Sequence, residues 1–196
     1  MPPFTPSVRP ALLLLLAASV AACAPAAGGG VDTPASPAPG PAPGPAPAPT
    51  LPPAPWTGAR LSASAVPAVY RAQWTRAANR ATCALVAPRA LGEGAGAIPR
   101  AATYSGGWAV AYDRPGQRGA FGVAGSGTTA DGASYAWPDT LRWADGSSAG
   151  YGLEGGTGPS HLAYLQIAGQ GCLYNVWSRL GRAHLVALLS ELRFVE

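Results

Sequence analysis

A run of alternating proline constrains most strongly how this chain can fold. From Pro37 to Pro49 every second residue is proline, and the residues between are alanine or glycine. Proline fixes φ, lacks a backbone donor and holds its predecessor extended, so the run favours polyproline II and offers nothing to bury in a core. We therefore expect a disordered Pro/Ala/Gly-rich tether. The 140 residues from Thr57 to Glu196 are then expected to form a single globular domain.

The first twenty residues have the layout of a secretory signal. Met1 to Pro10 carries one charged side chain, that of Arg9, and Ala11 to Val20 is apolar with five consecutive leucines. An apolar stretch of about ten residues is too short to span a bilayer, which takes about 20. The segment therefore predicts export from the cytoplasm.

The apolar stretch ends in Val20-Ala21-Ala22-Cys23, which resembles the lipobox of bacterial lipoproteins. The resemblance implies that residues 1–22 are a signal peptide, that Cys23 is alkylated by diacylglycerol, and that residues 23–56 form a lipid anchor and tether. It also implies a cell-envelope location, at the outer membrane or on the outer face of the cytoplasmic membrane, with the domain in the periplasm or at the cell surface. Two or three acyl chains would anchor the protein stably. Ordinary signal cleavage would instead leave Cys23 as a free thiol.

Once Cys23 is lipidated, two of the three cysteines remain, Cys83 and Cys172. An exported domain meets an oxidising compartment, where a leftover pair forms a disulfide. A metal or redox pair is the alternative, but the chain has no Cys-x-x-Cys and only two histidines. We therefore expect a structural disulfide that closes a loop of about 90 residues.

The hydrophobic pattern predicts an α+β fold with one antiparallel sheet of about five or six strands. An N-terminal helix over 66–81 and a C-terminal helix over 181–193 are expected to pack on it. The expected strands cover 82–87, 108–112, 121–123, 148–153, 161–168 and 172–178, with a loop over 88–102 and irregular chain over 135–143. The absence of strand–helix–strand alternation argues against a parallel sheet.

The basic residues exclude several function classes. All 13 are arginine, so a P-loop, a pyridoxal Schiff base and a Ser-x-x-Lys acylation site are impossible. The arginines are scattered and form no stripe that could follow a phosphate backbone, so no nucleic-acid partner is expected despite the net charge of +4. No cofactor and no metal site are expected either.

Two glycine-containing motifs match enzyme patterns but lack the required context. Gly146-Ser147-Ser148-Ala149-Gly150 matches the G-x-S-x-G nucleophile elbow, yet the glycine-rich residues after it cannot form the necessary helix. A glycine/serine turn is the favoured interpretation, and a small envelope hydrolase using Ser148 and His161 is kept as an alternative. The pattern G-x-G-x-x-G over 150–155 also lacks a following helix, so no dinucleotide site is expected.

Aromatic residues gather in a glycine-rich region between Tyr135 and Tyr151. Such rings either fill the core of a small sheet or contact a ligand or partner. Trp137, Trp143 and Tyr151 are therefore the candidate ligand-contacting residues.

Taken together, these patterns predict a membrane-anchored extracytoplasmic lipoprotein that is not an enzyme. Its role would be that of a binding module or envelope scaffold with an unknown ligand or partner. Besides the hydrolase, a second alternative is a carrier that holds an apolar ligand between the sheet and the helices.

Overall fold

The computed structural model describes residues 50–104, 106–126 and 136–196. The expected signal peptide, Cys23 and the alternating proline run therefore lie outside the described residues, as does Tyr135. The described residues form one compact unit.

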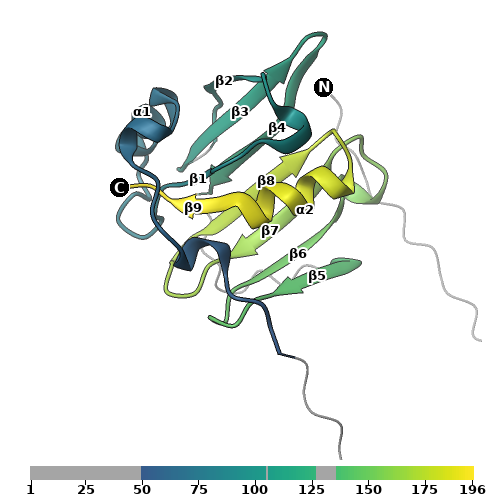
Figure 1. Cartoon of the computed structure of the whole chain (residues 1–196). Helices are drawn as coiled ribbons and strands as arrows, with labels where there is room; N and C mark the ends of the chain where they lie inside the picture. Colours follow the sequence, from purple (N-terminus) through teal and green to yellow (C-terminus); the bar gives the residue numbers. More distant parts are fainter. Residues whose placement is uncertain (1–49, 105, 127–135) are drawn as a thin grey trace, which may run out of the picture. The chain divides into compact units, whose positions relative to one another are not determined.

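The main sheet is antiparallel and has seven strands in the order β2-β3-β4-β8-β7-β6-β5 (Figure 1). Its strands are β2 (Ile98–Ala101), β3 (Trp108–Arg114), β4 (Gln117–Gly125), β5 (Asp139–Arg142), β6 (Ser148–Leu153), β7 (His161–Gln166) and β8 (Leu173–Ser178). A further pair, β1 (Val86–Pro88) and β9 (Leu192–Phe194), forms a separate two-stranded sheet. The expected antiparallel α+β class is confirmed in this coarse form.

The expected strand count was too low, because three short strands have no hydrophobic alternation of their own. β2 lies in the predicted loop over 88–102, and β5 lies in the predicted irregular segment over 135–143. Both are edge strands with one neighbour each, so pairing with β3 and β6 holds them in place. The nine described strands thus include three that only long-range pairing creates, with β9 the third.

Both helices are shorter than predicted. α1 covers Ala68–Arg76, after which Ala77 is extended and the carbonyl of Asn79 accepts bonds from the backbone N–H groups of Thr82 and Cys83. α2 covers Arg182–Glu191, and strand β9 follows it directly. The C-terminal element of the fold is therefore a strand, because pairing with β1 takes over from the helix.

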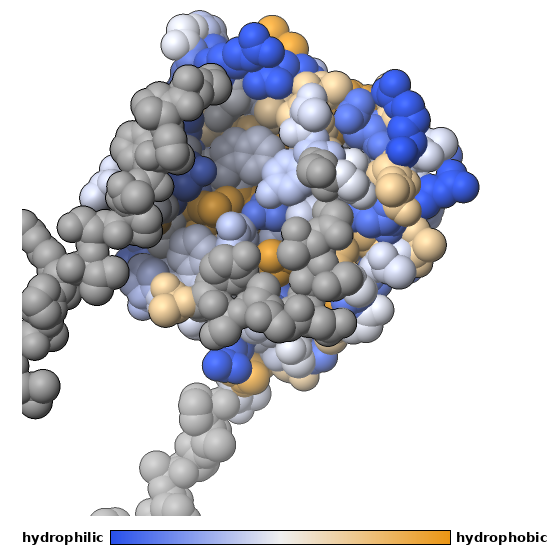
Figure 2. Space-filling view, turned by 180° about the vertical axis from the view of Figure 1, so that it is seen from behind, coloured by the Kyte–Doolittle hydropathy of each residue, from blue (hydrophilic) through white to orange (hydrophobic). Residues whose placement is uncertain are grey.

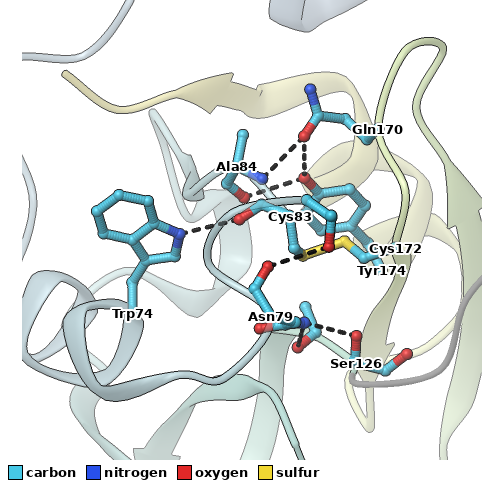
Figure 3. Close-up of a disulfide and its surroundings, with 10 residues drawn as sticks. Trp74, Asn79, Cys83, Ala84, Ser126, Gln170, Cys172 and Tyr174 are labelled. Atoms are coloured by element: carbon cyan, nitrogen blue, oxygen red, sulfur yellow. Dashed lines mark hydrogen bonds between the residues drawn. A yellow bond between two sulfur atoms is a disulfide. The ribbon is translucent and has the colours of Figure 1, made fainter.

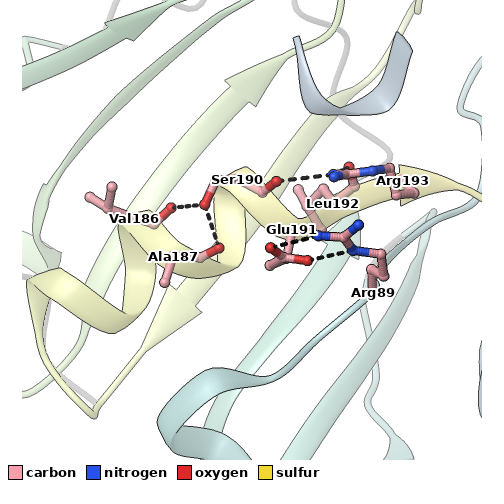
Figure 4. Close-up of polar contacts among 7 residues, drawn as sticks. All are labelled: Arg89, Val186, Ala187, Ser190, Glu191, Leu192 and Arg193. Carbon is pink, nitrogen blue, oxygen red and sulfur yellow. Dashed lines mark hydrogen bonds and ion pairs between the residues drawn. The ribbon is translucent and has the colours of Figure 1, made fainter. Parts of the chain in front are cut away.

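The end of α2 is also held by polar contacts (Figure 4). Arg89, just after β1, forms an ion pair of 2.9 Å with Glu191. Arg193 donates a 3.0 Å hydrogen bond to the carbonyl of Ser190. These contacts lie where the helix gives way to β9, and exposed ion pairs of this kind add little stability.

Both α-helices pack on one face of the main sheet, which we call the helical face (Figure 1). Tyr70 of α1 is fully buried against Trp108 and Tyr112, with ring centroids 6.2 and 6.3 Å away. Leu185 and Leu189 of α2 are equally buried. The side chains of the two helices thus fill the space above this face and form the core.

The disulfide between Cys83 and Cys172 is confirmed (Figure 3). It joins the segment before β1 to the residue before β8, and hydrogen bonds connect the same two segments. Ala84 N–H donates to Gln170 Oε1 over 2.8 Å, and Tyr174 O–H donates to the carbonyl of Ala84 over 3.0 Å. The covalent link therefore reinforces a junction that hydrogen bonds already define.

The ordered domain begins earlier than the sequence indicates. Trp56, assigned to the tether, is only 3% exposed, and its ring packs edge-on against Trp143 with centroids 4.9 Å apart. Ala54 is buried as well, and the carbonyl of Pro52 accepts a 2.9 Å hydrogen bond from Ala144. The chain therefore enters the domain at the turn between β5 and β6.

Candidate functional site on the second face of the sheet

The face of the main sheet opposite α1 and α2 is called here the second face. In an antiparallel sheet, residues directly opposite one another project to the same side. Trp177 lies opposite both Gly122 and Leu162, and Asn175 lies opposite Ala124 and Tyr164. Their strand neighbours Val176 and Ser178 project to the helical face, so Trp177, Asn175, Leu162 and Tyr164 share the second face. Figure 2 views the molecule from behind and shows this side hollowed.

Glycines on the strands let tryptophan rings lie close to the second face. A Cβ placed on Gly122 would collide with the benzene ring of Trp177 and lie 2.6 Å from the carbonyl of Val110. Trp137 lies over Gly150 and reaches toward Gly152, and its ring meets that of Tyr164 edge-on with centroids 5.1 Å apart. Gly150 and Gly152, two glycines of the G-x-G-x-x-G pattern, therefore leave room for the ring of Trp137.

A cavity of about 570 Å³, called here the hollow, opens on the second face. Its volume falls within the range of about 300–1,000 Å³ that is usual for ligand sites. Loops at one end of the sheet form its walls, from the segment after β2 and the turn between β6 and β7. Its principal residues are Ser160, Leu162, Tyr164, Asn175, Trp177 and Arg179.

Two residues of the hollow with little exposed surface have polar side chains that form no hydrogen bond to another described residue. Asn175 is 4% exposed and Ser160 is 8% exposed, and neither the amide of the first nor the hydroxyl of the second bonds to another described group. The fully buried side-chain atoms without a partner in the described part of the chain are Asn79 Oδ1, Trp108 Nε1 and Trp137 Nε1, so the polar atoms of Asn175 and Ser160 stay accessible from the cavity. These two groups line the same cavity, so a ligand there would meet both.

The charges around the hollow nearly balance. Arg179 and Glu154 both line it and both are exposed. Tyr104 and Thr103 contribute further polar groups from the segment after β2. The site therefore combines one cation, one anion and several neutral hydrogen-bonding groups around an indole ring, which allows binding and orientation of an uncharged polar molecule.

A second cavity of about 490 Å³ lies near the same end of the sheet. His161 lines it, together with Trp137, Asp139 and Arg182. Asp139 and Arg182 form an ion pair of 2.8 Å, and Arg182 also donates to the hydroxyl of Tyr151 over 3.1 Å. These charged groups bond to one another, whereas the buried indole N–H of Trp137, which also lines this cavity, has no hydrogen-bond partner in the described part of the chain.

The structure separates the three candidate aromatics. Trp143 is 7% exposed and Tyr151 is 5% exposed, so both rings belong to the core rather than to a ligand surface. Trp137 is half-buried on the second face. The physical reason is strand alternation: Tyr151 projects to the helical face, whereas its neighbours Gly150 and Gly152 project to the other.

Ser148 and His161 do not form a catalytic pair. Ser148 lies opposite Gln166 and His161 lies opposite Leu153, five positions farther along β6. That separation is about 17 Å along the strand, and the two side chains project to opposite faces. The geometry is incompatible with a nucleophile and base, which must lie within hydrogen-bond reach of one another.

The G-x-S-x-G segment instead begins with the turn of a β-hairpin. Gly146 has φ +89°, and β6 begins at Ser148, so a strand follows the turn rather than a helix. Ser147 donates both its N–H and its hydroxyl to the carboxylate of Asp145, each over 2.9 Å. Gly146 and Ser147 thus belong to the turn, whereas Ser148, the central serine of the pattern, is the first residue of β6.

His184 is buried under α2 and is part of the core. Its Nδ1 lies 2.8 Å from the hydroxyl of Ser178, and its Nε2 lies 3.0 Å from the carbonyl of Leu91. Burial lowers the pKa of His184, and Arg114 also lowers it, whereas the Leu91 carbonyl and Glu93 oppose the shift. Both nitrogens are satisfied, so this serine–histidine pair holds the fold together and is closed to substrate.

Sequence patterns alone do not single out the residues of the hollow. The one local signal is Asn175, a polar residue inside the otherwise apolar stretch Leu173–Trp177. Trp177 and Tyr164 are ordinary strand residues until the face that carries them is known. No group of three metal-binding side chains occurs within the described parts of the chain.

Scans against protein-family models, curated proteins and solved structures give no match for this chain, so its site is known from its own geometry. None of the helices in residues 50–104, 106–126 and 136–196 is long and apolar enough to cross a membrane.

Proposed function

We propose that this protein is a lipid-anchored, extracytoplasmic binding module that is not an enzyme, with the hollow as its ligand site. The observation that carries the binding role is that the side chains of Asn175 and Ser160, which bond to no other described residue, line the hollow beside the ring of Trp177. The anchor is supported by the resemblance of Val20-Ala21-Ala22-Cys23 to a lipobox. The disulfide agrees with an oxidising compartment outside the cytoplasm.

The hollow lies far from the residues through which the described chain enters the domain. The chain enters through Pro52 and Trp56 at the turn that precedes β6. The hollow lies beside Glu154 and Ser160, in the turn that follows β6. Six strand residues separate the two ends, about 20 Å. The point where the described chain enters the domain and the hollow therefore lie at opposite ends of β6.

Both alternative functions have less support. The hydrolase lacks a base near Ser148, because His161 lies about 17 Å along the sheet on the other face. A carrier of apolar ligands between sheet and helices would need space there, and the side chains of Tyr70, Leu185 and Leu189 occupy it.

The anchor is tested by labelling cells with radioactive palmitate. We expect wild-type protein to take up label and Cys23→Ser to take up none, since only the thiol of Cys23 accepts diacylglycerol. Cys83→Ala with Cys172→Ala is the matched control and should keep the label. Equal labelling of Cys23→Ser and wild type would contradict the anchor.

The binding role is tested in intact cells with a photoreactive residue. Thr103→benzoylphenylalanine places the probe at the wall of the hollow, and Arg71→benzoylphenylalanine places it on the exposed side of α1. Illumination should give a covalent adduct from position 103 and none from position 71. An absence of adducts at position 103, or equal adducts at both positions, would overturn the hollow as a binding site.

A further inference from the structure

We infer that the ligand of the hollow is a neutral saccharide, bound with one ring face against Trp177 and its hydroxyl groups toward Asn175 and Ser160. This inference rests on the proposed binding role of the hollow and adds the chemical class of the ligand. It follows from three properties of the site: its apolar surface, its unpaired hydrogen-bonding groups and its charge.

The apolar part of the hollow suits a flat ring with C–H groups on its face. Trp177 is half-buried and held against Gly122, so its indole is positioned before any ligand arrives. Leu162, directly opposite on β7, and Pro159 extend the apolar surface. A pyranose ring presents an apolar face of this kind, which an aromatic side chain can cover.

The polar part of the hollow suits hydroxyl groups. The amide of Asn175 carries two donors and one acceptor, and the hydroxyl of Ser160 both donates and accepts. Sugar hydroxyls also donate and accept, so adjacent hydroxyls on one ring can satisfy both side chains. A purely apolar ligand would leave the Asn175 amide and the Ser160 hydroxyl unpaired in a site it had dehydrated, which is unfavourable.

The charge of the hollow disfavours anionic ligands. Arg179 is balanced by Glu154 at the same cavity, so a phosphate or a polyanion would meet repulsion as well as attraction. Charge therefore favours a neutral molecule, and the saccharide satisfies the other two properties as well.

The test uses the full chain purified from membranes in a mild detergent. The purified protein is applied to an array of neutral oligosaccharides. The oligosaccharide that binds best is then titrated into the protein by calorimetry, and adenosine and oleate are titrated in the same way. We expect the saccharide to bind, and adenosine and oleate not to bind. Asn175→Leu should weaken the saccharide by about tenfold or more, because it keeps the size of the side chain and removes its hydrogen bonds.

Controls separate loss of binding from loss of structure. Ser160→Ala should weaken binding, whereas Ser190→Ala, on the exposed side of α2, should leave it unchanged. Asn175→Leu should keep the melting temperature of the wild type, since its amide makes no bond to described residues. Thermal unfolding of each variant checks this point before binding is compared.

The outcomes distinguish this inference from the proposed function. The inference is overturned if the protein binds no saccharide on the array, or if Asn175→Leu and Ser160→Ala leave saccharide binding unchanged. Binding of adenosine alone, weakened by Asn175→Leu, overturns the saccharide and keeps the binding role of the hollow. Tighter binding of oleate by Asn175→Leu also overturns the saccharide and identifies an apolar ligand.

Discussion

The indole N–H of Trp56 donates a 2.8 Å hydrogen bond to Oδ2 of Asp145, 89 positions later in the sequence. The same carboxylate accepts the N–H and the hydroxyl of Ser147, and the hydroxyl of Ser147 accepts a 2.9 Å bond from the N–H of Ala168. One aspartate thus connects the entry of the chain to the β5–β6 turn and, through Ser147, to the end of β7. The entry segment is therefore part of the domain.

We predict that Trp56→Ala lowers the free energy of unfolding by about 3–5 kcal/mol, because it removes a buried aromatic ring. Trp56→Phe keeps most of the ring and removes the N–H, so we expect a loss of about 1 kcal/mol. Urea denaturation measures both, with Leu51→Ala as the control at an exposed position of the same segment. If Trp56→Ala were as stable as the wild type, the entry segment would not contribute to the core.

The second prediction concerns pH and His184. Burial lowers the pKa of this residue in the folded protein, so the unfolded chain takes up a proton first as the pH falls. The free energy of unfolding should therefore decrease as the pH drops below about 6.5, the ordinary histidine value, and level off below the folded pKa. Chemical denaturation at a series of pH values measures the slope.

His184→Asn should remove this part of the pH dependence, although it lowers stability at every pH. His161→Asn is the matched control, since it removes the other histidine and leaves the buried ring in place. An unchanged slope in His184→Asn would assign the pH dependence to other groups.

The third prediction concerns the disulfide. Replacing both cysteines, Cys83→Ala with Cys172→Ala, should destabilise the domain by about 2–5 kcal/mol, because the unfolded chain regains the freedom of a loop of about 90 residues. The secondary structure should persist, since Gln170 and Tyr174 still bond to Ala84. Thermal unfolding followed by circular dichroism measures both effects. Loss of the folded spectrum at low temperature would contradict the expectation that the secondary structure persists.

The fourth prediction concerns Gly122. An added methyl group would collide with the ring of Trp177 and approach the carbonyl of Val110, so Gly122→Ala should cost about 1–3 kcal/mol and displace the ring. Tryptophan fluorescence measures the displacement of the Trp177 ring. Urea denaturation measures the loss in the free energy of unfolding. Gly58→Ala is the matched control, because its Cβ would meet no atom closer than 3.5 Å. Equal effects of the two substitutions would exclude a specific fit between Gly122 and Trp177.

Local pattern was sufficient for those parts of the fold that carry their own signal. The hairpin of β3 and β4 follows from the alternation of bulky and small residues on either side of a proline–glycine turn. The pairing of Cys83 with Cys172 follows from the number of cysteines and the expected compartment. The strands β2, β5 and β9 carry no such signal, because their conformation comes from pairing with residues elsewhere in the chain.

The candidate site shows the same division. Sequence alone identified a region rich in aromatic residues, and of its three candidates only Trp137 lies on the second face. A one-residue step along a strand moves a side chain to the other face, so the aromatic composition of the region cannot tell a core ring from an exposed one.

The sequence by itself determined the antiparallel character of the sheet, the partner of each domain cysteine and the extent of the domain apart from the entry segment before Thr57, since these depend on composition, alternation and counting. Tertiary structure alone decided which face of the sheet the helices cover. That choice buries Trp143 and Tyr151, separates Ser148 from His161, and brings Asn175, Ser160 and Trp177 to one cavity. The physical reason is that a side chain's environment depends on strand register and helix packing, which join residues far apart in the chain.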